Sequence, residues 1–398
     1  MKVPLLDLKE QLVPLRHEIM AAVTEVIDST GYIMGPKVEA FEKNIASYCG
    51  SKHAIGVASG TDALLVSLMA LGVGPGDLVM TTPFTFFATL GSILRLGAKP
   101  LFVDIDPVTY NIDPDLMSRV LAEDEKLAKK VKVILPVHLY GQCADMSRIK
   151  ALADQYGIPV LEDAAQAIGA ACPLVDGKNK RIWRKAGTIG AAGCFSFFPS
   201  KNLGGIGDGG MIVTDDDKLA ETMKIIRVHG GAPKYHHAII GGNFRLDPIQ
   251  AVVLDIKLKH LPGWHAARRE NADLYNTIFE ESGVIAENKV STPVGFYRSA
   301  AQAEATLPDY HIYNQYVIRA AERDSLLEFL GKEGIGAEIY YPIPLHKQKC
   351  LAGMGYNELS FPESEKAAKE TMALPIYPEL TDEMQQYVVD RIAAFYLG

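Results

Sequence analysis

One lysine stands in a context that suits a nucleophilic amine. Lys201 follows the aromatic run 195–198 and precedes a turn with glycines at positions 204, 205, 207, 209 and 210. A lysine that is stripped of water has a lowered pKa, and its neutral amine can attack a carbonyl group, as in Schiff-base enzymes. Most lysines are exposed, but the aromatic run favours burial here, and the glycines permit a tight loop against a ligand.

A carboxylate closes another apolar run. Asp163 ends the run 158–163, which we interpret as a buried strand. In open α/β sheets, ligands bind beyond the carboxyl ends of the strands. A carboxylate at such a place can coordinate a metal, hold a ribose or pair with a cationic ring nitrogen. The alternative is that Asp163 only caps the helix that follows.

The third feature is the start of a helix. The segment 57–68 (VASGTDALLVSL) predicts a strand end, a Ser-Gly-Thr turn and a helix, which leaves the N–H groups of Gly60, Thr61 and Asp62 unpaired. Such a helix start binds phosphate through its free donors and the helix dipole. The alternative is that Thr61 serves only as the N-cap.

Together the three features match what pyridoxal 5′-phosphate needs. The phosphate would dock on the helix start, Asp163 would keep the pyridine nitrogen protonated, and Lys201 would hold the aldehyde. An aromatic side chain is expected over the ring, and the segment 83–89 (PFTFFAT) supplies Phe86 or Phe87.

The elements that must position these residues form a regular alternation. Short apolar runs alternate with helical stretches such as 62–71 and 145–156, and the runs occupy 54–58, 78–82, 99–105, 132–138, 158–163, 193–198 and 210–214. Continuous apolar runs indicate strands that are buried on both faces. The alternation predicts a doubly wound α/β domain.

The pattern changes near residue 245. Residues 246–282 are mostly helical, with Pro262 interrupting, and helices are expected at 322–331, 363–372 and 382–396. The polar stretch 287–309 predicts a loop. We therefore expect a large α/β domain over 1–245 and a smaller C-terminal α+β domain over 246–398, linked by the helices of 246–282.

Composition excludes several classes of function. The chain has 398 residues and a formal net charge of −8, which argues against nucleic acid as the main partner. The 5 cysteines form no CxxC pair, so neither a disulfide framework nor a zinc ribbon is indicated, and a reducing cytoplasm is expected. No signal peptide and no membrane span of about 20 apolar residues is recognised.

Rival cofactor motifs are missing from the sequence. GIGDGG (205–210) lacks the GxGxxG spacing and precedes an apolar run that predicts a strand. The phosphate P-loop, HExxH and EF-hand patterns do not occur, and no metal site is expected. The pair His236 and His237 lacks companion ligands, so we expect it to be structural or to contact substrate.

At this point the sequence resembles a known family, the fold-type I pyridoxal-phosphate enzymes of the DegT/DnrJ/StrS sugar aminotransferase group. The resemblance runs over nearly the whole chain. It is carried by GYIMGPKVEAFE (31–42), ASGTDAL (58–64), PFTFFAT (83–89), VHLYGQCADM (137–146), EDAAQAIGA (162–170), FSFFPSKNLGGIGDGG (195–210), GGNFRLDPIQAVVL (241–254) and YYPIPLHKQ (340–348). It implies a fold-type I transferase with a mixed sheet in the large domain.

The resemblance implies roles at the cofactor ring. Lys201 is similar to the lysine that binds the cofactor aldehyde and also moves the proton between C4′ and the substrate carbon. Asp163 is similar to the pyridinium partner. Gln166 is similar to the hydrogen-bond partner of the ring hydroxyl, and Phe86 matches the aromatic residue that stacks on the ring.

The resemblance also implies roles at the cofactor phosphate. Gly60, Thr61 and Ser196 are similar to phosphate ligands. Asn243 matches the asparagine that reaches the phosphate of the neighbouring subunit, which implies a homodimer with shared active sites.

For the substrates, the resemblance implies glutamate and a nucleotide-linked keto sugar. Similarity is greatest to enzymes that aminate C3 of UDP-2-acetamido-3-keto sugars, hexoses or hexuronates, for cell-surface polysaccharide or lipopolysaccharide. Arg245 occupies the position that faces a sugar carboxylate in trans in uronate-specific enzymes. Tyr340, Tyr341 and His346 are further candidate substrate contacts, with packing as the alternative for each.

Other interpretations remain open at this point. The acceptor could instead be a dTDP- or GDP-linked 3-keto or 4-keto deoxysugar. A sugar dehydratase ranks lower, because the deoxygenating relatives replace the lysine with histidine, and so does a non-catalytic sensor. A nicotinamide-dependent oxidoreductase is disfavoured by the missing GxGxxG motif. The basic insert 173–187 is interpreted as a solvated loop, with a diphosphate contact as the alternative.

Overall fold

Most strands of the large domain form one continuous mixed sheet. The computed structural model describes residues 1–175, 180–233 and 235–398. One part of the sheet has the order β3-β2-β4 and the other β5-β8-β9-β1, and the bridges Ile134–Val160 and Val137–Asp163 join β4 to β5. All strands run parallel except β9, which is antiparallel to both neighbours. The strands are β1 (His53–Val57), β2 (Leu78–Thr81), β3 (Lys99–Phe102), β4 (Val131–Ile134), β5 (Leu161–Asp163), β8 (Ala192–Ser196) and β9 (Gly210–Thr214).

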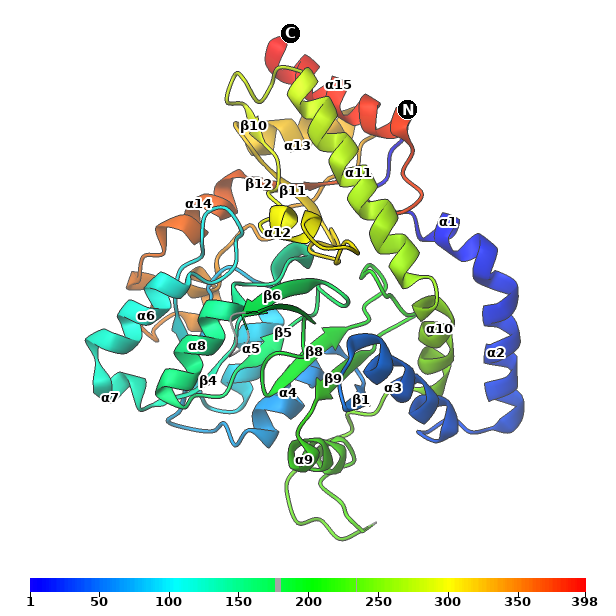
Figure 1. The fold of residues 1–398 in the computed structure, drawn as a ribbon, viewed down its shortest axis with the longest axis vertical. Coiled ribbons are helices and arrows are strands. Elements are labelled where there is room, and N and C mark those ends of the chain that lie inside the picture. Colours follow the sequence, from blue (N-terminus) through cyan, green and yellow to red (C-terminus); the bar gives the residue numbers. More distant parts are fainter. Residues whose placement is uncertain (176–179, 234) are drawn as a thin grey trace.

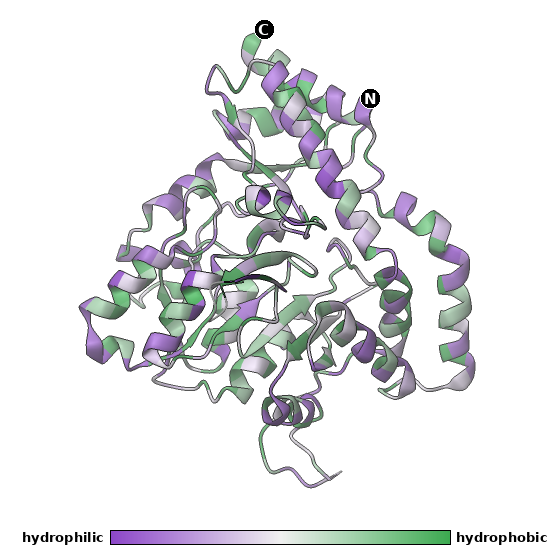
Figure 2. Cartoon of the chain, in the orientation of Figure 1, coloured by the Kyte–Doolittle hydropathy of each residue, from purple (hydrophilic) through white to green (hydrophobic). Residues whose placement is uncertain are grey.

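Helices cover both faces of this sheet (Figure 1). Successive strand residues alternate between two hydrophobic cores: Phe195, Met211 and Val213 belong to one, and Cys194 and Ile212 to the other. Both faces are therefore apolar, which is why the strands are continuous apolar runs in the sequence and appear hydrophobic in Figure 2. The helices are α1 (Leu8–Leu12), α2 (Arg16–Ser29), α3 (Pro36–Cys49), α4 (Gly60–Ala70), α5 (Phe87–Arg95), α6 (Pro114–Glu123), α7 (Glu125–Ala128), α8 (Met146–Tyr156), α9 (Asp217–Arg227) and α10 (Pro248–Leu258).

A smaller antiparallel sheet follows the long helix α11 in the chain and lies next to it (Figure 1). Its order is β10-β11-β12, and it has its own hydrophobic core. The N-terminal segment packs into the same domain: Val3 belongs to this core, its N–H donates to the Gly334 carbonyl (3.0 Å), and its carbonyl accepts from Gly336 (2.8 Å). The elements are α11 (Leu261–Glu281), β10 (Val290–Ser291), α12 (Arg298–Gln302), β11 (Tyr316–Ala320), α13 (Arg323–Lys332), α14 (Pro362–Glu370), β12 (Thr371–Leu374) and α15 (Asp382–Leu397).

Packing places α10 with the large sheet. Ala251 and Leu254 of α10 belong to the core of the large sheet, whereas the core of the small sheet begins within α11 at Ala272 and includes Val3. The boundary between residues 245 and 246 remains a prediction.

Three local expectations differ from the structure. The polar stretch 287–309 contains β10 and α12. Pro262 lies in the first turn of α11, where its missing N–H costs nothing, so it starts this helix and does not interrupt it. The insert 173–187 is largely an antiparallel hairpin of β6 (Ala171–Val175) and β7 (Arg181–Lys185), and residues 176–179 lie outside the described residues.

The described parts of the chain contain no helix that combines the length and the apolar character needed to span a membrane.

Candidate active site

Several of the predicted site residues lie at one edge of the large sheet. Asp163 is the last residue of β5 and Ser196 is the last residue of β8, and these two strands are parallel neighbours. β1 is parallel to β8 across β9, and after β1 the chain turns into α4 at Gly60. The carboxyl ends of these strands therefore meet at the edge where α/β proteins bind ligands.

Asp163 is a buried carboxyl group that is held by donors. It is 4 % exposed, and it accepts hydrogen bonds from Thr89 Oγ1 (2.8 Å) and the Ala165 N–H (3.3 Å). Burial raises the pKa of Asp163, and the Thr89 and Ala165 hydrogen bonds and the Lys201 charge act against this rise. A buried carboxylate is kept in its ionised form by hydrogen bonds and by a cationic partner. The protonated ring nitrogen of pyridoxal phosphate has the chemistry of such a partner.

Lys201 lies in the turn after β8. Its N–H donates to the Phe198 carbonyl (2.8 Å). Burial lowers the pKa of the Lys201 ammonium to about 8, and the charge of Asp163 acts in the opposite direction. A substantial fraction of the amine is therefore neutral near physiological pH, as a nucleophile requires.

The start of α4 forms a cradle against β8. A Cβ atom on Gly60 would lie 2.6 Å from the Ser196 Cβ, so only glycine permits this approach. Ser59 is the N-cap, and its Oγ accepts from the Asp62 N–H (3.0 Å); the interpretation of Thr61 as N-cap is therefore wrong. The N–H groups of Gly60 and Thr61, in the first turn, have no helical acceptor. Free donors beside a serine hydroxyl suit a phosphate group.

A wall of polar and aromatic groups lies next to Asp163. The Tyr140 N–H donates to Gln166 Oε1 (2.7 Å), and Gln166 Nε2 donates to the Tyr341 hydroxyl oxygen (3.1 Å). Burial raises the pKa of Tyr341, and the charge of Asp163 adds to the rise. The Phe86 ring centroid is 6.1 Å from that of Tyr341, and Phe86 is 58 % exposed. Gln166, Tyr341 and Phe86 thus belong to one surface.

The remaining predicted residues occupy different surroundings. Asn243 is exposed, and its backbone pairs with Val228. Arg245 pairs with Val57 at the end of β1 and lines a cavity of about 460 Å³ that also borders Ser59 and Asp62.

The two other candidate substrate contacts have internal partners. The Tyr340 carbonyl accepts from the Tyr140 hydroxyl. His346 is buried, with its Nε2 3.0 Å from Glu365 Oε1 and its ring 4.8 Å from that of Phe361. The contacts of His346 are those of packing, the alternative considered for it.

Two groups that support Asp163 escaped the sequence analysis. One is Thr89, which lies within the PFTFFAT segment and 74 residues before its partner. The other is the buried pair of His138 and Glu162. His138 Nδ1 accepts from the Ala144 N–H (3.1 Å), so Nε2 carries the proton and donates to Glu162 Oε2 (2.8 Å).

Glu162 connects this pair to the chain around it. Its carboxylate also accepts from the N–H groups of Gly187 (2.8 Å), Ile189 (2.7 Å) and Gly190 (2.6 Å), between β7 and β8. The His138 N–H donates to the Asp163 carbonyl (2.9 Å). The sequence signal was a charged residue inside an otherwise apolar run.

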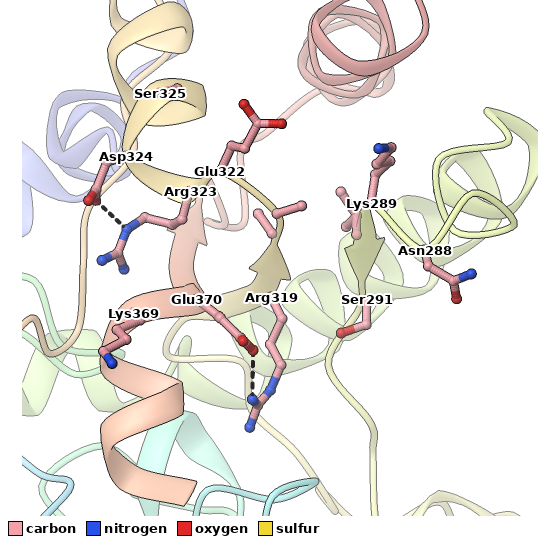
Figure 3. Close-up of a pocket in the computed structure, with 13 residues that line it drawn as sticks. Asn288, Lys289, Ser291, Arg319, Glu322, Arg323, Asp324, Ser325, Lys369 and Glu370 are labelled. Carbon is pink, nitrogen blue, oxygen red and sulfur yellow. Dashed lines mark hydrogen bonds and ion pairs between the residues drawn. The ribbon is translucent and has the colours of Figure 1, made fainter. Parts of the chain in front are cut away.

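A cavity of about 670 Å³ lies away from this cluster, on the small domain (Figure 3). It lies between β10, β11 and the start of α13, and none of the predicted site residues lines it. Its charged groups are partly paired with each other, as in Arg319–Glu370 (3.1 Å) and Arg323–Asp324 (2.6 Å). Size alone therefore does not mark the reactive site of this molecule.

Comparison with known proteins supports the interpretation of the cluster. Residues 14–393 match the DegT/DnrJ/EryC1/StrS aminotransferase family. A protein of Geobacillus stearothermophilus named "Pleiotropic regulatory protein" is 50 % identical over 100 % of this chain and 99 % of its own length. The UDP-2-acetamido-2-deoxy-3-oxo-D-glucuronate aminotransferase of Pseudomonas aeruginosa is 40 % identical over 94 % of this chain and 95 % of its own.

Similarity extends to enzymes that are named for another nucleotide. The dTDP-3-amino-3,4,6-trideoxy-alpha-D-glucose transaminase of Streptomyces venezuelae is 37 % identical over 98 % of this chain and 95 % of its own. Among solved structures, S. venezuelae DesV in complex with a ketimine intermediate superposes with a TM-score of 0.86, at 37 % identity over 99 % of this chain and 98 % of that one. The predicted fold class is thereby confirmed. The chain belongs to the DegT/DnrJ/EryC1/StrS aminotransferase family and is a pyridoxal-phosphate-dependent sugar aminotransferase.

Proposed function

We propose that the protein transfers the amino group of glutamate to C3 of a nucleotide-linked 3-keto sugar. The acceptor we propose is a UDP-2-acetamido-3-keto hexose or hexuronate. We expect the reaction to take place in the cytoplasm and its product to be used in the biosynthesis of cell-surface polysaccharide or lipopolysaccharide. The observation that carries the aminotransferase chemistry is the buried Asp163 carboxyl group, whose charge acts on the Lys201 amine, together with the Gly60–Ser196 cradle. The name of the P. aeruginosa relative supports the acceptor. A dTDP-linked deoxysugar is the second candidate, favoured by the name of the S. venezuelae relative.

The residues of the cluster have complementary roles in this proposal. When bound, pyridoxal phosphate supplies an electron sink for the carbon that gains or loses the amino group. The Asp163 carboxylate, oriented by Thr89, would accept the ring N–H. The Lys201 amine would hold the aldehyde carbon and, once free, would carry the proton to and from the substrate carbon. Gln166 would bind the ring hydroxyl.

Binding and shielding fall to the neighbouring residues. The N–H groups of Gly60 and Thr61, with the Ser196 hydroxyl, would hold the phosphate. Phe86 would cover one face of the ring and exclude water from it. What supports these roles is that α4 starts after β1 and Ser196 ends β8, at neighbouring carboxyl ends of the sheet.

We further propose a homodimer in which Asn243 of one copy reaches the phosphate site of the other. The exposure of Asn243 and the 58 % exposure of the apolar Phe86 support this arrangement. Mixing Lys201→Ala with Asn243→Ala subunits tests it. Two inactive parents should regain up to about a quarter of the wild-type sites, since half of the dimers are then mixed and each has one intact site. No regain after verified subunit exchange would contradict shared sites.

Arg245 is our candidate for the carboxylate of a uronate acceptor, in trans, with Tyr340 and Tyr341 as further contacts. Arg245 Nε is buried without a hydrogen-bond partner in the described residues, so its guanidinium has capacity for a ligand. Arg245→Ala should then slow the amination of uronates and leave neutral sugars unchanged. Equal effects on both would refute the carboxylate contact.

The acceptor can be identified with a panel of UDP-, dTDP- and GDP-linked 3-keto and 4-keto sugars. Glutamate-dependent release of 2-oxoglutarate is measured for each, and Lys201→Ala is the inactive control. The proposal expects the highest kcat/KM with a UDP-linked 3-keto sugar. A higher kcat/KM with a dTDP-linked or 4-keto sugar would overturn the proposed acceptor while leaving the aminotransferase chemistry intact.

A further inference from the structure

The loop that follows Lys201 is held from outside by two side chains of α10. Lys257 Nζ donates to the Gly204 carbonyl (2.7 Å), and Gln250 Oε1 accepts from the Ile206 N–H (2.9 Å). The backbone lies close to α10, since a Cβ atom on Gly207 would lie 2.6 Å from Gln250 Nε2. The Lys201 loop, residues 199–207, therefore owes part of its shape to α10.

Lys257 also connects this loop to the N-terminal segment. Its Nζ donates to Gln11 Oε1 (3.1 Å) in α1, and both side chains are buried. A few residues earlier, the same segment pairs Val3 with Gly334 and Gly336 of the small domain. Lys257 is thus the point at which the N-terminal segment meets the Lys201 loop.

Burial of Lys257 costs more free energy than burial of an apolar side chain at the same position would. It is 5 % exposed, and none of the described carboxylates lies within ion-pair distance of its ammonium group. Burying an ammonium group without an anionic partner costs free energy, and an apolar side chain of similar volume often packs as well or better. The stability of α10 therefore does not explain why a lysine occupies this position. The 2.7 Å hydrogen bond from its ammonium group to the Gly204 carbonyl of the Lys201 loop does.

We propose that Lys257 is a positioning residue, which fixes the backbone at Gly204 so that the Lys201 amine keeps its place beside Asp163. The inference rests on the proposed role of Lys201, but not on the identity of the acceptor sugar. A loop that is released at Gly204 lets water reach Lys201 and moves its amine away from the reacting carbon. Lys257 itself touches neither cofactor nor substrate in this role.

The test compares Lys257→Met with Lys259→Met. Methionine keeps an apolar stem and removes the ammonium group. Lys259 is the matched control because it follows α10 directly and pairs with the surface residue Glu18. Three quantities are measured: the pH midpoint of Lys201 labelling in protein stripped of cofactor, the kcat and KM of the glutamate half-reaction, and the thermal unfolding midpoint.

We expect Lys257→Met to raise the labelling midpoint of Lys201 and to lower kcat by about tenfold or more, with a smaller change in KM for glutamate. A displacement of about 1 Å in a reacting group can cost about 10²-fold in rate. Lys259→Met should match the wild type in all three measurements. If Lys257→Met fails to fold, Gln11→Met replaces it, and the same shifts are expected at smaller size.

The outcomes separate two kinds of failure. If Lys257→Met keeps the wild-type labelling midpoint and kcat and changes only the unfolding midpoint, Lys257 is structural and the inference is overturned. If Lys201→Ala itself retains transamination, the proposed role of Lys201 fails, whatever Lys257 does.

Discussion

The charge state of Lys201 gives a quantitative test of the site. With a pKa of about 8 in place of 10.5, about one quarter of the Lys201 amine is neutral at pH 7.5, compared with about one thousandth for an ordinary lysine. The fraction of neutral amine at Lys201 should therefore be about 200-fold higher in the folded protein than at an ordinary exposed lysine. Replacing Asp163 with Asn removes the one charge that opposes this shift, so the pKa of Lys201 should fall further.

The assay is competitive labelling of lysines with a trace of acetic anhydride between pH 6 and 11, read by mass spectrometry of the Lys201 peptide. The protein is first stripped of pyridoxal phosphate, and the same protein in denaturant is the control, where the midpoint should return to about 10.5. A midpoint near 10.5 in the folded wild type would refute the burial argument. A midpoint that stays constant or rises in Asp163→Asn would refute the attribution to Asp163.

Three further predictions follow from contacts near the site. Thr89→Val removes a donor to Asp163, and a hydrogen bond to a charged group is worth about 1.5–3 kcal/mol, so cofactor affinity in a spectroscopic titration should fall about tenfold or more; unchanged affinity would contradict the contact. Gly60→Ala sets a Cβ atom against Ser196 at 2.6 Å, so it should weaken phosphate binding, and adding Ser196→Gly should restore the unfolding midpoint but not the affinity. Burial lowers the pKa of Lys257 to about 8, so between pH 8 and 10 the unfolded chain binds more protons than the folded one and the free energy of unfolding rises with pH. This rise, measured by denaturant unfolding at several pH values, should be smaller in Lys257→Met. An equal rise in Lys257→Met and the wild type would contradict the pKa shift of Lys257.

The large sheet could be predicted because its strands face two cores. Residues such as Cys194 and Phe195 point to opposite faces and both meet apolar helices, so the strands are uninterrupted apolar runs. The hairpin of β6 and β7 could not be predicted in this way. β7 (Arg181–Lys185) carries three basic residues among five, and its pairing partner sets its structure more than any apolar pattern does. The two-residue strand β10 is too short for any periodicity.

The site could be predicted where chemistry is local in the sequence. Asp163 ends β5 and Lys201 lies in the turn after β8, and a strand end is visible in the apolar pattern. Thr89 and Lys257 act through partners 74 and 53 residues away, and nothing in their own neighbourhoods identifies those partners. A long-range hydrogen bond becomes visible only when the fold brings the two segments together.

The position of β1 at the edge of the large sheet has a consequence for how the protein is made. β1 pairs with β9, so His53 cannot form its strand pair until Thr214 has been synthesised. On β1, Val57 also forms a bridge with Arg245, which is synthesised later still. Contacts between segments so far apart in the sequence form slowly, because the chain loses entropy on closing a long loop before the contacts can stabilise it. During synthesis, Gly60 leaves the ribosome long before Ser196, so the early half of the phosphate cradle stays unpaired until most of the domain exists. The cofactor should therefore be a late arrival, which binds a nearly finished domain and does not template it.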